Sequence, residues 1–378
     1  MKRLRPVLST LAFLGIAAMA GAEAITLPPS GDNQKCSVMQ GIGLVRVQID
    51  YSSPDVRGPG GEDRRGKIWG DLVPYGFSDL GFNDCKQCPW RAGANENTVL
   101  TVSHDVMFEG KPLKAGRYGL FMIPGKDEWT LVLSGNAHSW GAYSYDPSED
   151  VLRVPVKPVK SEYHEWLTYE FDDRQPDHAT CALKWEELAI PFQIRVPDMS
   201  GLYVAQIRRD LEGGKGFEWM ELQAAAQYCL QNKVNLEEAA VWAEKAVSMP
   251  GVGRANSTTL GTLAQVQLAA GKQAEGLATL DRSLSLGGES AINLHQFARQ
   301  LQGNGFKDAA MKVFVANAKQ HPREWPVTLG LARGHDMMGD PKRALVYAKQ
   351  AVVQAPDEPS RKNVQNFIAT LEKKIAGN

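Results

Sequence analysis

The sequence lacks an excess of charge of either sign. Its 378 residues carry 42 Lys and Arg against 43 Asp and Glu, which gives a formal net charge of -1. Nucleic-acid binding requires a concentrated basic surface that contacts phosphates. Neither the overall balance nor any long run of one sign supplies such a surface. We therefore predict no nucleic-acid partner.

The sequence also lacks the common fingerprints of catalysis and cofactor binding. It contains no G-x-S-x-G elbow, no H-E-x-x-H helix, no P-loop and no G-x-G-x-x-G turn. Its seven histidines, such as His104 and His138, are scattered without the spacing of metal ligands. No cofactor is predicted, and the sequence favours binding over catalysis.

After residue 24 no hydrophobic run is long enough to span a bilayer, which takes roughly 20 apolar residues. Residues 1–24 pass from a basic stretch into an apolar run, Val7–Met19, and end in Ala22-Glu23-Ala24. This pattern is typical of a secretory signal peptide. We expect it to be cleaved and the protein to be exported in soluble form, with periplasmic and extracellular destinations both open.

Cysteines are few, and their odd count of five leaves at least one thiol unpaired. In an oxidising compartment disulfides form and persist. Cys85 and Cys88 stand three residues apart, so they can form a local disulfide, a redox pair or half of a metal site whose metal is unknown. Pro89 and Trp90 follow in a loop instead of a helix start, which disfavours a thioredoxin-like pair.

Short β-branched and aromatic runs fill the region from Leu44 to Pro197 and predict an all-β, sandwich-like domain. Pro54–Gly66 is rich in Gly, Pro and charge and is expected to be an exposed loop. Pro191 predicts a sheet edge or a bulge. The expected strands are Leu44–Tyr51, Thr98–Ser103, Tyr118–Ile123, Trp129–Leu133, Val151–Val156, Trp166–Phe171, Thr180–Trp185 and Leu188–Ile194.

The C-terminal region repeats in a fixed register. Gly271, Gly305 and Gly339 recur at a constant spacing of 34 residues, as do Ala264, Ala298 and Ala332. That period predicts tetratricopeptide repeats, an all-α scaffold for protein–protein interaction. A less regular unit precedes the three regular ones, and a polar helix caps them. The expected divisions are a signal peptide (1–24), a lead-in (25–43), the β-domain (44–200), a linker (201–216) and the repeats (217–378).

Two places along the sequence are candidate binding sites. In the β-domain, Trp90, Arg91, Asn95 and Glu96 combine a stacking face, a guanidinium, an amide and a carboxylate. The alternative is an internal network that joins Arg91 to Glu96 or to the backbone. Trp140 and Tyr143 can line a groove or simply pack at the end of the sandwich.

In the repeats, the register brings His295, Arg299, Arg333 and Asp336 to the face formed by the first helices. Arg299 and Arg333 lie one period apart and can hold an acidic side chain or the C-terminal carboxylate of a peptide. The alternative is ordinary solvated helix charge.

Four strings carry a family resemblance: GKIWGDLVPYG (66–76), WRAGANENT (90–98), AGRYGLFMIPGKDEWTLVL (115–133) and WGAYSYDPSEDVLRVPV (140–156). Over roughly Val45–Ile194 the chain resembles an exported bacterial β-domain family, domain-of-unknown-function family twenty-nine eleven. The resemblance implies export and a sandwich-like fold, often followed by tetratricopeptide repeats, but no established activity. Phe77–Pro89, with the cysteine pair, interrupts the family pattern and indicates a local adaptation.

These features predict an exported, non-enzymatic binding or scaffold protein. The β-domain would present a ligand or envelope-contact site, and the repeats would recruit a protein partner. One alternative is a periplasmic thiol oxidoreductase or metal-binding protein that uses Cys85 and Cys88. Another is an envelope hydrolase that uses Glu96, although no partner carboxylate for paired acid–base chemistry is evident. A purely structural envelope protein is the third.

Overall fold

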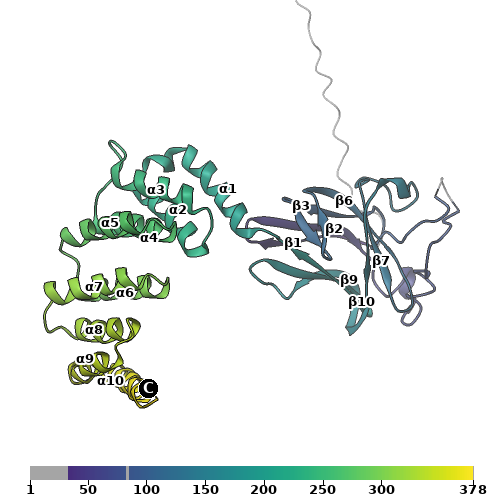
Figure 1. Ribbon diagram of the computed structural model, residues 1–378. Coiled ribbons are helices and arrows are strands. Elements are labelled where there is room, and N and C mark those ends of the chain that lie inside the picture. Colours follow the sequence, from purple (N-terminus) through teal and green to yellow (C-terminus); the bar gives the residue numbers. More distant parts are fainter. Residues whose placement is uncertain (1–32, 82–84, 378) are drawn as a thin grey trace, which may run out of the picture. The chain divides into compact units, whose positions relative to one another are not determined.

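The computed structural model describes residues 33–81 and 85–377, and the chain divides into two compact units between Arg195 and Val196 (Figure 1). The first, the β-unit, contains two antiparallel sheets, and the second, the helical unit, contains helices, which confirms the predicted fold class. The expected signal peptide, residues 1–24, lies outside the described residues. Over the described ranges, no helix combines the length and apolarity needed to cross a bilayer.

The larger sheet of the β-unit has the strand order β1-β2-β3-β6-β7-β8. Along β2, Val45, Val47 and Ile49 are fully buried while Arg46 is exposed, because successive side chains of a strand point to opposite faces. The buried face of this sheet forms part of the core. Its strands are β1 (Gln34–Ile42), β2 (Val45–Ser53), β3 (Thr98–Val102), β6 (Gly116–Ile123), β7 (Trp129–Ser134) and β8 (Asp150–Val156).

The smaller sheet has the order β5-β4-β10-β9, with β4 (Val106–Phe108), β5 (Lys111–Leu113), β9 (Val159–Asp172) and β10 (His178–Arg195). It contacts the larger sheet through two tyrosines. The rings of Tyr51 on β2 and Tyr169 on β9 meet edge to face with centroids 4.9 Å apart, and the Tyr169 backbone N–H donates to the Tyr51 hydroxyl at 3.3 Å. The two buried faces therefore share one core, as in a sandwich.

Strand β10 replaces the two separate strands predicted at Thr180–Trp185 and Leu188–Ile194. An irregularity between Lys184 and Leu188 lets one strand continue, with Glu186 at a φ of 54°. Pro191 lies in this central strand instead of at a sheet edge. It falls between the last pair with β9, at Ala189, and the first pair with β4, at Ile194, so its missing N–H breaks no ladder bond.

Three strands were not predicted. β1 occupies the expected lead-in, and eight of its nine residues are partly or fully exposed, so its sequence shows little hydrophobic alternation. β4 and β5 have three residues each and are joined by Glu109 and Gly110, both at positive φ. Such two-residue turns favour a tight hairpin, but a strand of three residues is too short to give a period.

The connection between β2 and β3, residues 54–97, builds most of the candidate site. It contains a short 3-10 turn, Pro59–Gly61, and is held to the sheets by isolated bridges. Trp90 exchanges two backbone hydrogen bonds of 2.8 Å with Met122 of β6. These bridges fix loop residues on the sandwich, which is where binding groups tend to lie.

The helical unit consists of successive helices that lie side by side along the chain (Figure 1). First helices of the regular pairs start at 257, 291 and 325 and second helices at 273, 307 and 341, which confirms the predicted register. The helices are α1 (Met199–Glu212), α2 (Trp219–Asn232), α3 (Leu236–Ser248), α4 (Ser257–Ala269), α5 (Gln273–Ser285), α6 (Ala291–Gly303), α7 (Lys307–Gln320), α8 (Trp325–Met337), α9 (Pro341–Gln354) and α10 (Glu358–Ala376).

Small residues set the packing of these helix pairs. Ala264, Ala298 and Ala332 are fully buried, and a Cβ added at Gly276 would lie 2.6 Å from the Leu268 side chain. Gly271, at a φ of 79°, forms one of the turns between paired helices. The sequence period therefore corresponds to close helix contacts, as expected for stacked repeats.

Residues 201–216 were predicted to be a linker, but the structure forms a helix over most of this range. Most of it belongs to α1, which begins after the N-cap Asp198 and ends before Gly213. Val204 is buried, and Ile207 and Leu211 pack against the same core as Leu222 of α2. The spacing of these three apolar residues is helical, but the glycines at 213–216 made the whole segment resemble a flexible connection.

Candidate functional site

The predicted group around Trp90 is divided between two hollows of the β-unit. Trp90, Arg91 and Asn95 border a cavity of about 480 Å³, which we call the aromatic cavity. Glu96 borders a different hollow, together with Lys35 and Arg117. Asn95 has a φ of 55°, so the chain turns at this residue, and Arg91 before the turn and Glu96 after it border different hollows. The grouping of Glu96 with Arg91 predicted from the sequence was therefore wrong.

Tryptophans form the apolar floor of the aromatic cavity. The rings of Trp90 and Trp185 are nearly parallel, with an interplanar angle of 13° and centroids 6.3 Å apart. Trp69 meets Trp90, Trp129 and Trp185 edge to face at 5.7, 5.2 and 5.6 Å. Trp185 is buried, and its indole Nε1 has no hydrogen-bond partner. A buried indole N–H usually finds an acceptor, so Trp185 Nε1 is an exception at the border of this cavity.

Arg91 is held in place at the border of the same cavity. Its Nη1 donates to the Asn95 carbonyl at 2.6 Å, and its guanidinium carbon lies 5.3 Å from the centre of the Tyr143 ring. A Cβ at Gly141 would lie 2.5 Å from the guanidinium, so this position requires the absence of a side chain. Among the described residues, no carboxylate forms an ion pair with Arg91. The structure thus contains the Arg91-to-backbone bond of the predicted internal network but not its bond to Glu96.

Glu96 has partners of its own. Lys35 Nζ lies 2.8 Å from Oε1, and Ser52 Oγ donates to Oε2 at 3.2 Å. These hydrogen bonds, that from Lys35 above all, lower the pKa of Glu96. A carboxyl group with a lowered pKa is ionised at neutral pH and cannot serve as a general acid. In a hydrolase, Glu96 could therefore act only as a base or a nucleophile.

Trp140 and Tyr143 have different surroundings. Tyr143 lies beneath the Arg91 guanidinium, which makes it a support for the aromatic cavity. Trp140 is 60% exposed and does not border the cavity. Of the two predicted aromatic residues, only Tyr143 contacts Arg91.

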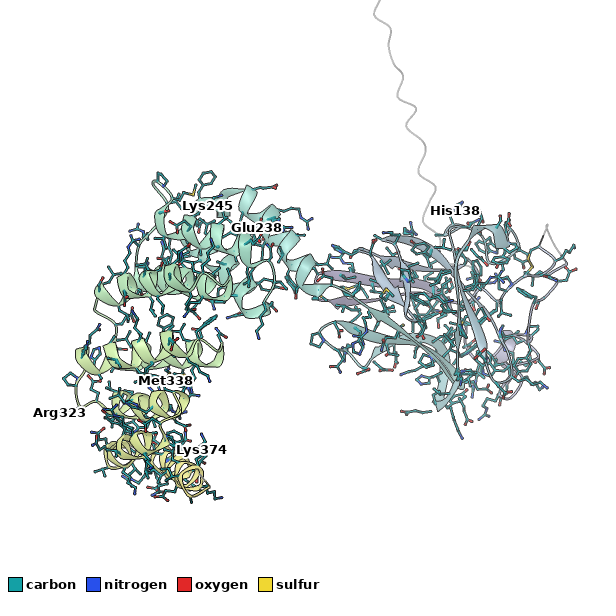
Figure 2. The ribbon with its side chains drawn as sticks, in the orientation of Figure 1. His138, Glu238, Lys245, Arg323, Met338 and Lys374 are labelled. Carbon is teal, nitrogen blue, oxygen red and sulfur yellow. A yellow bond between two sulfur atoms is a disulfide. The ribbon has the colours of Figure 1, made fainter. Side chains whose placement is uncertain are left out.

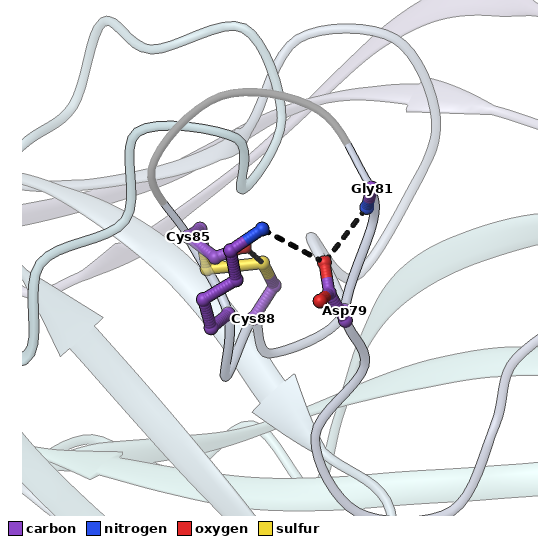
Figure 3. The surroundings of a disulfide bond; sticks show 5 residues. Asp79, Gly81, Cys85 and Cys88 are labelled. Carbon is purple, nitrogen blue, oxygen red and sulfur yellow. Dashed lines mark hydrogen bonds and ion pairs between the residues drawn. A yellow bond between two sulfur atoms is a disulfide. The ribbon is translucent and has the colours of Figure 1, made fainter.

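The cysteine pair lies in the same connection as Trp90. Cys85 and Cys88 have Cα atoms 5.6 Å apart, close enough for a disulfide (Figure 3). Both are buried against Phe121, Val132, Ala142 and Tyr145. No group of three metal-binding side chains occurs in the described part of the chain. Catalytic thiols are normally accessible and lie near positive charge, so this burial opposes the redox alternative.

In the helical unit, the register aligns one residue from each first helix. Gln227, Gln265, Arg299 and Arg333 occupy equivalent positions on α2, α4, α6 and α8, each directly after a fully buried alanine. We call this set the inner column. Along the chain, the first two side chains of the inner column are amides and the last two are guanidiniums. The sequence pattern indicated the two arginines but not the amides. Gln265 precedes Arg299 by the same 34 residues, whereas Gln227 precedes Gln265 by 38, so the amide on α2 falls outside the regular period.

The amides border a groove of about 360 Å³ that is lined mainly by α2, α4 and α6, with Glu289 and residues of α5 and α7 at its border. Besides Gln227 and Gln265, the groove is lined by Gln223, Gln296 and Gln300, while Phe297 gives it an apolar wall. Amide side chains both donate and accept hydrogen bonds, as peptide groups do. The groove therefore matches the chemistry of an extended peptide backbone.

Arg333 is a partly buried cation without a counter-ion. Its Nε is buried and has no hydrogen-bond partner, and its guanidinium carbon lies 5.6 Å from the centre of the Phe367 ring. Burial, together with the charge of Arg299, lowers its pKa to about 10. Neither arginine forms an ion pair within the described residues. Their charges are available to an anion.

His295 and Asp336, the other predicted residues, differ in availability. His295 is buried beside Phe314, with ring centroids 5.8 Å apart, and its Nδ1 has no hydrogen-bond partner. Burial first and Arg333 second lower its pKa to about 4, so the ring is neutral near pH 7. Asp336 is paired with Lys374 of α10, at 2.7 Å from Nζ to Oδ1; Figure 2 labels this lysine. Asp336 therefore does not neutralise the inner column.

Comparison with known proteins agrees with the division into two units. Residues 33–194 match the model of a family described as a protein of unknown function (DUF2911). This match confirms the resemblance found in the sequence and extends it to β1. Three of the four strings that carry the resemblance contribute residues to the aromatic cavity. No curated protein matches the chain.

The solved structures that resemble the chain include tetratricopeptide proteins. TTC0263, a thermophilic tetratricopeptide protein of Thermus thermophilus, is 16% identical, with coverage of 46% of this chain and 90% of that one and a TM-score of 0.31. YrrB, a tetratricopeptide protein with an unusual peptide-binding site, is 18% identical, with coverage of 45% of this chain and 89% of that one and a TM-score of 0.28. pilF of Pseudomonas aeruginosa is 18% identical, with coverage of 44% of this chain and 72% of that one and a TM-score of 0.30. The repeat architecture itself rests on the helix register and packing described above.

Proposed function

We propose that this chain is an exported, non-enzymatic binding protein whose helical unit recruits an acidic segment of a protein partner. The observation that carries the proposal is Arg333, a partly buried guanidinium with no carboxylate beside it. Burying a cation without an anion costs free energy. An incoming carboxylate would offset that cost and form charge-assisted hydrogen bonds with Arg333 and Arg299.

The amide groove supports the choice of a peptide as partner. Gln227 and Gln265 precede the two arginines in the inner column, so one extended segment can meet amides first and guanidiniums next. The amides would bond the peptide backbone, and the guanidiniums would bind an acidic side chain or the terminal carboxylate. Such a division gives affinity from the backbone and specificity from charge.

The β-unit contributes a second binding site in this proposal, at the aromatic cavity beside Trp90 and Arg91. Glu96 and Trp140 do not belong to it. We further propose that Cys85 and Cys88 form a structural disulfide that stiffens the connection next to the cavity, as export to an oxidising compartment would favour. Fractionation of cells that express the full-length chain would test export, and mass analysis after alkylation would test the disulfide.

The peptide proposal can be tested by fluorescence polarisation with labelled decapeptides. One peptide ends in three acidic residues and a free carboxylate, and its control carries amides in place of every acid. We expect the acidic peptide to bind the full chain and Arg333→Gln to weaken it by about tenfold, the effect of one lost charge-assisted pair. Arg282→Gln, at an exposed position on α5, is the matched control and should change nothing.

Two results would contradict this proposal. Equal binding of the acidic and amidated peptides would show that the guanidiniums recognise no anion. An equal loss of affinity in the Arg333 and Arg282 variants would show that net charge, and not the inner column, governs binding. Circular dichroism of each variant would establish that the helices remain folded.

A further inference from the structure

The charged groups around the aromatic cavity sum to one positive charge. Asp55, Arg64 and Arg91 are the charged residues among those that border it. Asp55 and Arg64 lie 3.7 Å apart, and their side chains are only 20% and 17% exposed, so these charges offset each other. Arg91 has no such carboxylate among the described residues. A monoanion would complete the site, whereas a second negative charge would meet Asp55.

The remainder of the cavity is aromatic and apolar. Trp90 and Trp185 form the floor, and Leu72 and Leu80, which are 47% and 36% exposed, stand at its border. Exposed large apolar side chains around a concave surface typically mark a ligand site. The volume of about 480 Å³ falls within the usual range for small-molecule pockets.

We infer that the aromatic cavity binds a small monocarboxylate with a flat aromatic body. The carboxylate would bond the Arg91 guanidinium, whose Nη1 bond to Asn95 and contact with Tyr143 hold the group in place. The aromatic body would lie against the tryptophan floor and the leucines. The unpartnered Nε1 of Trp185 provides a donor for an acceptor atom on the same ligand. This inference rests on the proposal that the β-unit holds a ligand, and it assigns that ligand a chemical class.

Isothermal titration calorimetry with three probes tests the assignment on the full-length chain. The probes are 1-naphthoate, the neutral analogue 1-naphthalenemethanol, and inorganic phosphate, an anion without an apolar body. We expect naphthoate to bind at least about tenfold more tightly than the alcohol, and phosphate to give no saturable binding. Arg91→Gln should reduce the affinity for naphthoate by about tenfold and leave that for the alcohol unchanged.

Two further variants make the result specific. Arg65→Gln removes an exposed arginine that pairs with Asp63 and does not border the cavity, so it should bind naphthoate as the unmodified chain does. Leu72→Asp places a negative charge at the exposed border and should repel naphthoate. This second variant keeps the test valid if Arg91→Gln fails to fold, because Leu72 is not part of the core.

The outcomes separate the two levels of the inference. If naphthoate and the alcohol bind equally and both respond to Leu72→Asp, the cavity is a ligand site but the acid class is wrong. If no probe binds, or if Arg91→Gln and Leu72→Asp leave naphthoate binding unchanged, the inference about the aromatic cavity is overturned. Neither result affects the peptide proposal, which is tested at Arg333 in the other unit.

Discussion

The aromatic cavity and the inner column are built in opposite ways. The cavity brings together residues such as Arg64, Leu72, Arg91 and Trp185, which are far apart in the sequence. The inner column takes one residue from each first helix at a regular spacing. A change in the β-unit should therefore disturb one shared core, whereas a change in the repeats acts mainly on neighbouring helices. The predictions below test this difference.

The largest effect is expected for Trp129→Ala. Trp129 is 1% exposed and contacts both Trp69 and Trp90. Its truncation should lower the free energy of unfolding of the β-unit by about 3–5 kcal/mol, because it leaves a large cavity in a shared core. Six of the nine tryptophans lie in the β-unit, so denaturant unfolding followed by tryptophan fluorescence reports mainly on that unit and would show the loss. The far-ultraviolet circular dichroism of the helices should change little, and an equal shift of both signals would contradict the independence of the two units.

An intermediate effect is expected from acid on the helical unit. Burial lowers the pKa of His295 from 6.5 to about 4, so protonation favours the unfolded chain. The corresponding stability is fully present above pH 6.5 and is lost as the pH falls towards 4. At pH 5 the loss should be about 2 kcal/mol.

The control for this effect is His295→Gln, which cannot titrate. Its unfolding free energy, measured by helical circular dichroism in urea, should fall less between pH 7 and pH 5 than that of the unmodified chain. The pKa of His335 is also lowered by burial, so some pH dependence will remain. Identical pH dependence in both proteins would show that His295 is not the titrating group.

The contrast between the two sites also explains what the sequence could predict. The 34-residue spacing placed Arg299 and Arg333 on one face because repeat geometry is local and regular. The spacing could not show that Arg333 has no carboxylate partner. In the structure the Arg333 guanidinium lies over the Phe367 ring, and Asp336 pairs with Lys374 instead.

In the β-unit, local pattern gave most of the strands but only part of the site. Trp90 and Arg91 were identified because they adjoin in sequence. Trp185 was not, because it reaches the cavity only through the pairing of β10 in the second sheet. Glu96 was wrongly grouped with Arg91, since the positive φ of Asn95 is not evident from residue types alone.

A smaller effect, and the most informative one, is expected for Arg333→Met. Methionine keeps much of the length and the apolar contact with Phe367 but removes the uncompensated charge. Replacing buried charges by apolar side chains is often stabilising, so the unfolding free energy of the helical unit should rise by about 1 kcal/mol. The same variant should no longer bind the acidic peptide. Glu96→Gln breaks the exposed pair with Lys35 and should change stability by only about 0.5 kcal/mol. If Arg333→Met instead destabilises the helices, the guanidinium already has a stabilising partner in the free protein, and the argument for an anionic ligand at the inner column fails.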